Sequence, residues 1–186
     1  MISSTNRKDY LGICVMLFLA LAVGPGCQEA KPPPSPKAAA FSREVQSVIN
    51  RIAPPLAGPV AQKDRKADQK ALEKVFSLCA EECQDMFYYV FILDQQGVLT
   101  ALYPPAEVNK FQFSNYKGVQ KAFAEKKPNQ TALYKPNGTL IYIIYVPLIH
   151  EGHMVGIVAF GLEENKVLEE GGLSEKEFLA LDFKTP

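Results

Sequence analysis

The hydrophobic positions of the chain concentrate in four runs, at residues 87–94, 98–103, 140–149 and 154–162. Polar, glycine-containing turns separate the first run from the second and the third run from the fourth. Two apolar runs joined by such a turn are typical of a β-hairpin. The pattern therefore predicts two hairpins in one antiparallel sheet, with residues 104–136 inserted between them.

These runs are apolar on both sides of the predicted strands. In the first run, Phe91 and Leu93 alternate with Val90 and Ile92. An antiparallel sheet with one face in water alternates apolar and polar residues instead. Both faces of this sheet are therefore expected to be covered, one by the preceding helices and the other by the insert.

Two helices are predicted before the sheet. Apolar residues at helical spacing mark the first over residues 41–52, and Pro54-Pro55 is expected to end it. The second is predicted over residues 62–87. Its charged beginning, residues 63–68, is expected to be a solvated helical face.

The insert is rich in aromatic residues. A short helix is predicted from Lys117-Gly118 to Lys127, followed by an edge strand at residues 131–135 and a turn at Asn137-Gly138. A sheet covered by an aromatic insert can enclose a small-molecule pocket. The alternative is that these aromatic side chains only fill the core.

After the sheet, residues 163–170 are predicted to form a short acidic helix. Ser174 and Glu177 then have the spacing of a capping box, which predicts a last helix that packs back on the domain. No second apolar run of about 20 residues follows, so we expect no membrane-spanning segment and no output module after this domain.

The first 26 residues have the pattern of a secretory signal peptide, with Arg7 and Lys8 before an uncharged apolar run. A permanent transmembrane helix is the alternative, although the run is shorter than the roughly 20 residues that span a bilayer. Cys27 follows small residues, which resembles the lipidation site of a bacterial lipoprotein. Ordinary secretion with a cut after Ala22 is the competing interpretation.

Residues 27–40 are rich in proline and alanine and are predicted to be a tether, which leaves residues 41–186 as a single domain. A lipid-anchored protein of the bacterial cell envelope, outside the cytoplasm, is then expected. Gln28 after the cysteine resembles an outer-membrane destination, with the domain facing the periplasm.

Cys79 and Cys83 share the apolar face of the second predicted helix. Three interpretations stay open for them: two buried thiols, a disulfide, or a redox or metal role. A disulfide needs a Cβ–Cβ distance of about 3.8 Å, whereas Cβ atoms at this spacing in a regular helix lie about 6 Å apart.

Composition excludes some classes of function. Lys plus Arg and Asp plus Glu both number 20, so no bulk charge attracts nucleic acid. No P-loop, dinucleotide-binding or nucleophile-elbow motif is present, and we expect neither an enzyme nor a cofactor. The only histidines, His150 and His153, flank Glu151-Gly152, which favours a hairpin turn over a metal site.

The order of several short motifs resembles a Cache domain, the PAS-like extracytoplasmic sensor module. The motifs are Leu93-Asp94-x-x-Gly97, Tyr116-Lys117-Gly118 before a helix, Asn137-Gly138, Val146-Pro147 and Val155-Gly156-Ile157-Val158. The resemblance implies an α+β fold, in which a long N-terminal helix precedes an antiparallel sheet of about five strands. It also implies a small ligand, such as an amino acid or a carboxylate, held between the sheet and a helical insert.

Amino-acid-binding members of that family hold the ligand carboxylate with an Arg in the insert and the amine with an Asp near the later strands. Here the last arginine is Arg65, and no aspartate lies between Asp94 and Asp182. The expected ligand is therefore an apolar or aromatic molecule or a monoanion rather than a typical amino acid. The candidate ligand-binding residues are Tyr89, Tyr103, Phe113, Tyr116, Lys117, Tyr134 and Tyr142.

The sequence thus predicts an exported, lipid-anchored sensor-like domain that binds a small molecule or signals to a partner protein. A lipoprotein with the same fold but no pocket, acting in structure or protein interaction, is the alternative. A redox protein that uses Cys79 and Cys83 is a third hypothesis.

Overall fold

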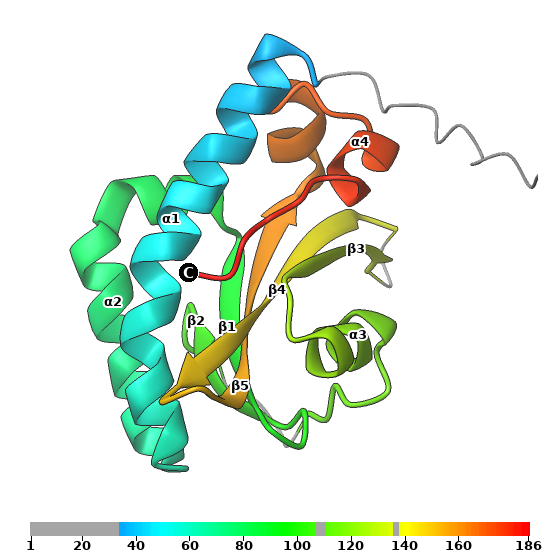
Figure 1. The fold of residues 1–186 in the computed structure, drawn as a ribbon. Coiled ribbons are helices and arrows are strands. Elements are labelled where there is room, and N and C mark those ends of the chain that lie inside the picture. The colour runs from blue at the N-terminus through cyan, green and yellow to red at the C-terminus, as the bar shows by residue number, and fades with distance from the viewer. Residues whose placement is uncertain (1–33, 107–110, 136–137) are drawn as a thin grey trace, which may run out of the picture. The chain divides into compact units, whose positions relative to one another are not determined.

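The computed structural model describes residues 34–106, 111–135 and 138–186, with only the backbone described at residues 80–82 and 84. Two long helices come first, and a sheet with an inserted helix follows (Figure 1). The helices are α1 (Pro36–Ala61), α2 (Arg65–Met86), α3 (Lys117–Glu125), the π-helix η1 (Lys166–Glu170) and α4 (Glu175–Leu179). The strands are β1 (Tyr89–Asp94), β2 (Leu99–Tyr103), β3 (Asn129–Tyr134), β4 (Leu140–His150) and β5 (His153–Glu163).

The five strands form one antiparallel sheet in the order β2-β1-β5-β4-β3. β4 and β5 are its long central hairpin, and β2 and β3 are its edges. The predicted α+β architecture, with a sheet of about five strands, a long N-terminal helix and a helical insert, is confirmed.

Each face of the sheet packs against a different layer. On one face, β-strand residues such as Ile92, Ile144 and Phe160 join the buried side chains of α1 and α2 in one core. On the other face, a second core contains Phe91 and Tyr145 together with residues of α3. Side chains of a strand point alternately to its two faces, which divides each apolar run between the two cores. The prediction that helices cover one face and the insert covers the other is confirmed.

The first helix is longer than predicted at both ends. It begins at Pro36, where the Ser35 hydroxyl accepts a hydrogen bond from the Ala38 amide, so the prediction that residues 36–40 belong to a tether is wrong. Proline is favourable in the first helical turn because its missing N–H has no helical partner there. The helix also continues through Pro54-Pro55 to Ala61. Its buried face, which includes Leu56, packs on the sheet and offsets the cost of the prolines.

The two predicted hairpin turns are present. Between β1 and β2, one Asp94 carboxylate oxygen accepts hydrogen bonds from the amides of Gln96 and Val98, both at 2.9 Å. Between β4 and β5, Glu151 and Gly152 both have positive φ, as the two-residue turns of β-hairpins require. The turn interpretation of the His150–His153 segment is therefore confirmed.

At the C-terminal end, the predicted capping box is present. The Ser174 side chain accepts from the Glu177 amide, and the Glu177 carboxylate accepts from the Ser174 amide. Phe178 of this helix is buried against Tyr142 of β4, with ring centroids 4.8 Å apart. The last helix thus packs on the domain, as expected.

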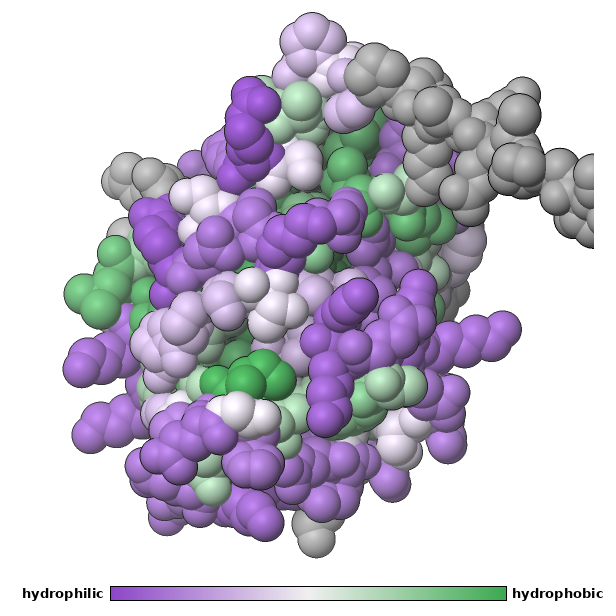
Figure 2. Space-filling view, in the orientation of Figure 1, coloured by the Kyte–Doolittle hydropathy of each residue, from purple (hydrophilic) through white to green (hydrophobic). Residues whose placement is uncertain are grey.

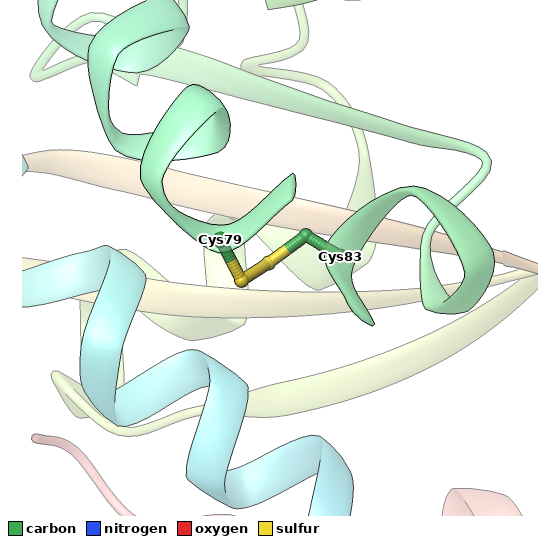
Figure 3. Close-up of a disulfide and its surroundings, with 2 residues drawn as sticks. All are labelled: Cys79 and Cys83. Carbon is green, nitrogen blue, oxygen red and sulfur yellow. A yellow bond between two sulfur atoms is a disulfide. The ribbon is translucent and has the colours of Figure 1, made fainter. Parts of the chain in front are cut away.

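A disulfide joins Cys79 and Cys83 within α2, with 5.6 Å between their Cα atoms (Figure 3). Of the three interpretations left open by the sequence, the structure has the disulfide. Cys83 is fully buried on the helix side of the sheet, and Cys79 packs at the edge of the same core.

Among the described residues, no helix is both long and apolar enough to cross a membrane. The predicted signal peptide, Cys27 and the proline-rich part of the tether lie outside the described residues.

Candidate functional site

A pocket of about 380 Å³ lies where the insert meets the edge of the sheet. Its walls come from the N-terminal end of α3, from strand β3 and from one side chain of β4. We call it the insert pocket; it is lined by Asn115, Tyr116, Lys117, Gly118, Thr131, Ala132, Leu133 and Tyr145.

The pocket depends on a close approach of α3 to the sheet. A Cβ atom at Gly118 would lie only 2.4 Å from the Tyr145 ring and 2.8 Å from the Thr131 methyl group. The buried Asn129 side chain fixes this approach, because its amide donates a hydrogen bond of 3.0 Å to the Gly118 carbonyl. The helix therefore begins directly against β3 and β4.

Tyr145, Tyr116 and Tyr89 place phenol groups in and next to the insert pocket. Burial raises the pKa of Tyr145 to about 12, and the nearby Tyr116 acts in the same direction, whereas the Thr131 hydroxyl opposes them. Burial is also the main cause of the raised pKa of Tyr89, with smaller contributions from Tyr145, Tyr88 and Tyr116. With raised pKa values, the Tyr145 and Tyr89 phenols are neutral at physiological pH, and their hydroxyl groups can donate hydrogen bonds.

Three aromatic rings contact one another next to the insert pocket. Phe113 lies between Phe91 and Tyr116, with ring centroids 5.1 and 5.2 Å away. The Phe113 amide donates to the Gly97 carbonyl at 2.7 Å, which ties the insert to the β1–β2 turn. Next to Tyr116, the insert side of the sheet is thus filled with aromatic side chains.

The structure places four of the predicted ligand-binding residues on the insert side of the sheet. Tyr116 and Lys117 line the insert pocket directly. Phe113 and Tyr89 belong to the packed core next to it.

The other three predicted residues lie elsewhere. Tyr103 stacks on Phe76 of α2, with ring centroids 4.4 Å apart, and Tyr142 is fully buried on the same helix side. Tyr134 is 72% exposed near the end of β3 and does not line the pocket. The structure therefore does not bring these tyrosines together with Tyr116 and Lys117.

Tyr145 and Thr131 are two polar lining residues that the predicted ligand-binding set does not contain. Tyr145 has the same strand parity as Ile141 and Ile143, so it was identifiable once the insert side of β4 was known. Thr131 pairs with Ile143 on the neighbouring strand, which places it on that side too. Its hydroxyl is buried and lies beside the Tyr145 phenol, whose pKa it lowers as a hydrogen-bonding neighbour.

The chemistry of the lining suits a neutral or singly negative molecule. Lys117 offers a cation at the rim, and Asn115, Thr131 and Tyr145 offer hydrogen-bonding groups. Among the described residues that line the pocket, none is Asp, Glu or Arg. The described lining residues therefore offer no carboxylate for an amine and no guanidinium for a bidentate carboxylate contact.

No protein-family model matches the chain, and no curated protein matches it in sequence. Solved structures do match its fold. The ligand-binding domain of the Pseudomonas aeruginosa PAO1 amino-acid chemoreceptor PctB, in complex with L-Gln, superimposes with a TM-score of 0.56 at 16% identity over 74% of this chain. That of the chemoreceptor PctC from the same organism, in complex with GABA, gives a TM-score of 0.53 at 15% identity over 70% of this chain.

An extracellular ligand-binding receptor from Desulfohalobium retbaense also matches, with a TM-score of 0.50 at 14% identity over 73% of this chain and 26% of the receptor. The chain spans only 56% of the PctB domain and 58% of the PctC domain. At these identities the likeness is one of fold. The described residues thus have the Cache-like fold found in the ligand-binding domains of bacterial chemoreceptors.

Proposed function

We propose that this protein is an exported, sensor-like domain that binds a small molecule in the insert pocket. The observation that carries the proposal is the convergence of Lys117, Thr131 and the Tyr145 phenol around a pocket between insert and sheet. The fold supports it, since the matching solved structures are ligand-binding domains of receptors rather than enzymes.

The ligand that fits these walls is a small monoanion with an apolar or aromatic body. Tyr116 and Leu133 supply apolar walls, and Lys117 supplies a single positive charge without the planar geometry of a guanidinium. An α-amino acid fits less well, because its ammonium group would find no carboxylate among the described lining residues.

A thermal-shift screen of small carboxylates and amino acids tests the proposal. We expect an aromatic or short aliphatic monocarboxylate to raise the melting temperature in proportion to the logarithm of its concentration. Lys117→Met should reduce this effect. Lys121→Met is the matched control, because Lys121 lies one turn further along α3 and does not line the insert pocket. The proposal fails if no compound of any class stabilises the protein, or if both variants respond like wild type.

Protein interaction through the helical layer is a second candidate function. A groove of about 420 Å³ between α1 and α2 is lined mainly by apolar side chains, among them Ile52, Pro55 and Val75. Leu78 at this groove is 80% exposed. Figure 2 shows an apolar area at the left edge of the molecule, over α2, whereas most of that face is polar. Loss of partner co-purification in Leu78→Lys, with ligand response retained, would favour this function.

Lipid anchoring through Cys27 is part of the proposal, with the domain in the periplasm and the anchor in the outer membrane. Its support is the sequence pattern of the leader. The intact mass of the protein from the membrane fraction tests it: we expect a lipidated cysteine at the N-terminus. An unmodified N-terminus at Val23 would contradict the anchor.

A further inference from the structure

A second pocket, of about 170 Å³, lies at the corner of the domain where the α1–α2 turn meets the β1–β2 turn. We call it the corner pocket. It belongs to the helix side of the sheet, whereas the insert pocket lies on the other side. Its lining combines Lys63, Arg65 and Asp68 from the helices with Asp94, Gln95, Gln96 and Thr100 from the hairpin and with Val60 and Val155.

A pair of hydrogen bonds fixes the position of α2 along the edge strand β2. The Gln69 side chain donates to the Leu102 carbonyl and accepts from the Leu102 amide, both at 3.0 Å. This pair satisfies the free edge of β2 in the way a neighbouring strand would. Asp68 precedes Gln69 in α2, so the same contact places Asp68 in the interior of the domain, beside Thr100 of β2.

Asp68 is 1% exposed, which is unusual for a carboxylate. Its Oδ1 atom and the Thr100 Oγ1 atom are both buried, and neither completes a hydrogen bond with a described residue. No ion pair among the described residues joins Asp68 to Lys63 or Arg65. The Thr100 hydroxyl lies near enough to lower the pKa of Asp68 as a side-chain donor, but no charged donor pairs with this carboxylate among the described residues. A buried carboxylate without a charged partner is costly, and a ligand that supplies a charged donor would reduce that cost.

The charged groups around Asp68 come from the α1–α2 region and from the β1–β2 hairpin. Burial is the main cause of its raised pKa; Asp64 and Asp94 add to the increase, while Thr100 and Arg65 oppose it. Asp94 already accepts two backbone hydrogen bonds within its turn. Two carboxylates thus face one small pocket: Asp94 has two backbone donors, whereas the donor beside Asp68 is the Thr100 hydroxyl.

We propose that the corner pocket binds the primary ammonium group of a small amine through Asp68 and Thr100. An ammonium group has three N–H donors, and here it would lie beside the buried Asp68 and Thr100 oxygen atoms and the nearby Asp94 carboxylate. The pocket has room for only a few non-hydrogen atoms. The described residues hold no group of three or more His, Cys, Asp or Glu side chains suited to a metal ion, which favours an amine over a metal.

Thermal shift of the full protein with methylammonium and ethanolammonium chloride tests this inference. Tetramethylammonium chloride keeps the ionic strength constant and has no N–H donor. We expect the primary amines to raise the melting temperature of wild type as their concentration passes Kd. Asp68→Asn should weaken the response at least about tenfold, equivalent to about 1.4 kcal/mol. Thr100→Val should weaken it to a smaller extent.

Asp85→Asn is the matched control, because Asp85 is an exposed aspartate of the same helix, and it should respond like wild type. The proposal is overturned if wild type shows no response to primary amines, if Asp68→Asn responds equally, or if tetramethylammonium stabilises as well. Stabilisation by calcium or sodium chloride without any by amines would assign the pocket to a metal ion instead. A Lys117→Met variant that keeps the amine response separates this site from the insert pocket.

Discussion

Replacing Gly118 by alanine tests whether the close approach of α3 to the sheet is required. The new Cβ atom would lie 2.4 Å from a Tyr145 ring carbon and 2.8 Å from the Thr131 methyl group, so α3 or the ring has to move. Overpacking of this kind costs about 1–3 kcal/mol. Replacing glycine by alanine within a helix otherwise stabilises the folded state by about 0.5–1 kcal/mol. We expect a net loss of up to about 2.5 kcal/mol in the free energy of unfolding, and a melting temperature lower by up to about 10 °C.

Gly58→Ala in α1 is the matched control for this experiment. There the nearest atom to the new Cβ, the Cε1 atom of His150, lies 3.8 Å away, so the same substitution should stabilise the protein by about 0.5–1 kcal/mol. Urea unfolding of both variants measures the difference. In a Tyr145→Leu background, Gly118→Ala should cost less, because the ring that it meets is gone. The packing argument is refuted if Gly118→Ala is as stable as Gly58→Ala.

Three further predictions concern the disulfide and two buried titratable groups. Reduction of the disulfide, or replacement of Cys79 and Cys83 by serine, should lower the free energy of unfolding by about 2 kcal/mol or less, because the bridge closes a loop of only four residues. Urea unfolding measures this loss, and an unchanged urea midpoint would contradict a stabilising bridge. Wild type should lose stability as the pH rises from 10 towards 12, because the Tyr145 phenol ionises first in the unfolded chain. Tyr145→Phe should lose less, as measured by urea unfolding across that range, and an equal loss would count against burial of the phenol. The pKa of Asp68 is raised in the folded state. The contribution of this group to the free energy of unfolding is therefore present at low pH and is lost as the pH rises through the folded-state pKa. In amine-free buffer, Asp68→Asn should therefore be more stable than wild type at neutral pH, with a gain that shrinks towards pH 4; a gain independent of pH would contradict the charge argument.

The sheet was predictable because its signals are local. Four of the five strands coincide with an apolar run, and Gly97 and Gly152 mark the two hairpin turns. Apolarity on both sides of the strands was enough to predict two covering layers. The beginning and the continuation of α1 were not predictable in this way. Proline signals such as Pro54-Pro55 are local too, and here burial of the opposite helix face outweighs them.

The side of the sheet on which each tyrosine lies was less predictable. When both faces are apolar, alternation does not say which parity faces the insert, so Tyr142 was chosen although Tyr145 lines the pocket. For Tyr103 a shift in the β1–β2 pairing between Ile92 and Leu93 also alters the register. Asp68 was expected on a solvated helical face, and that expectation is wrong. Pairing of Gln69 with β2 buries Asp68, and this contact between distant segments leaves no local pattern.

Two walls of the insert pocket differ in how their strands are paired in the sheet. Tyr145 lies on β4, which pairs on both sides, whereas Thr131 lies on the edge strand β3, which pairs only with β4. A wall supported on one side can adjust to a ligand at lower cost than the centre of a sheet. β3 also holds the C-terminal segment, because the Gln130 side chain donates to the carbonyls of Phe178 and Leu181. A ligand that moves β3 would therefore act directly on the contacts that hold this segment, and this gives the domain a physical route from an occupied pocket to its surface.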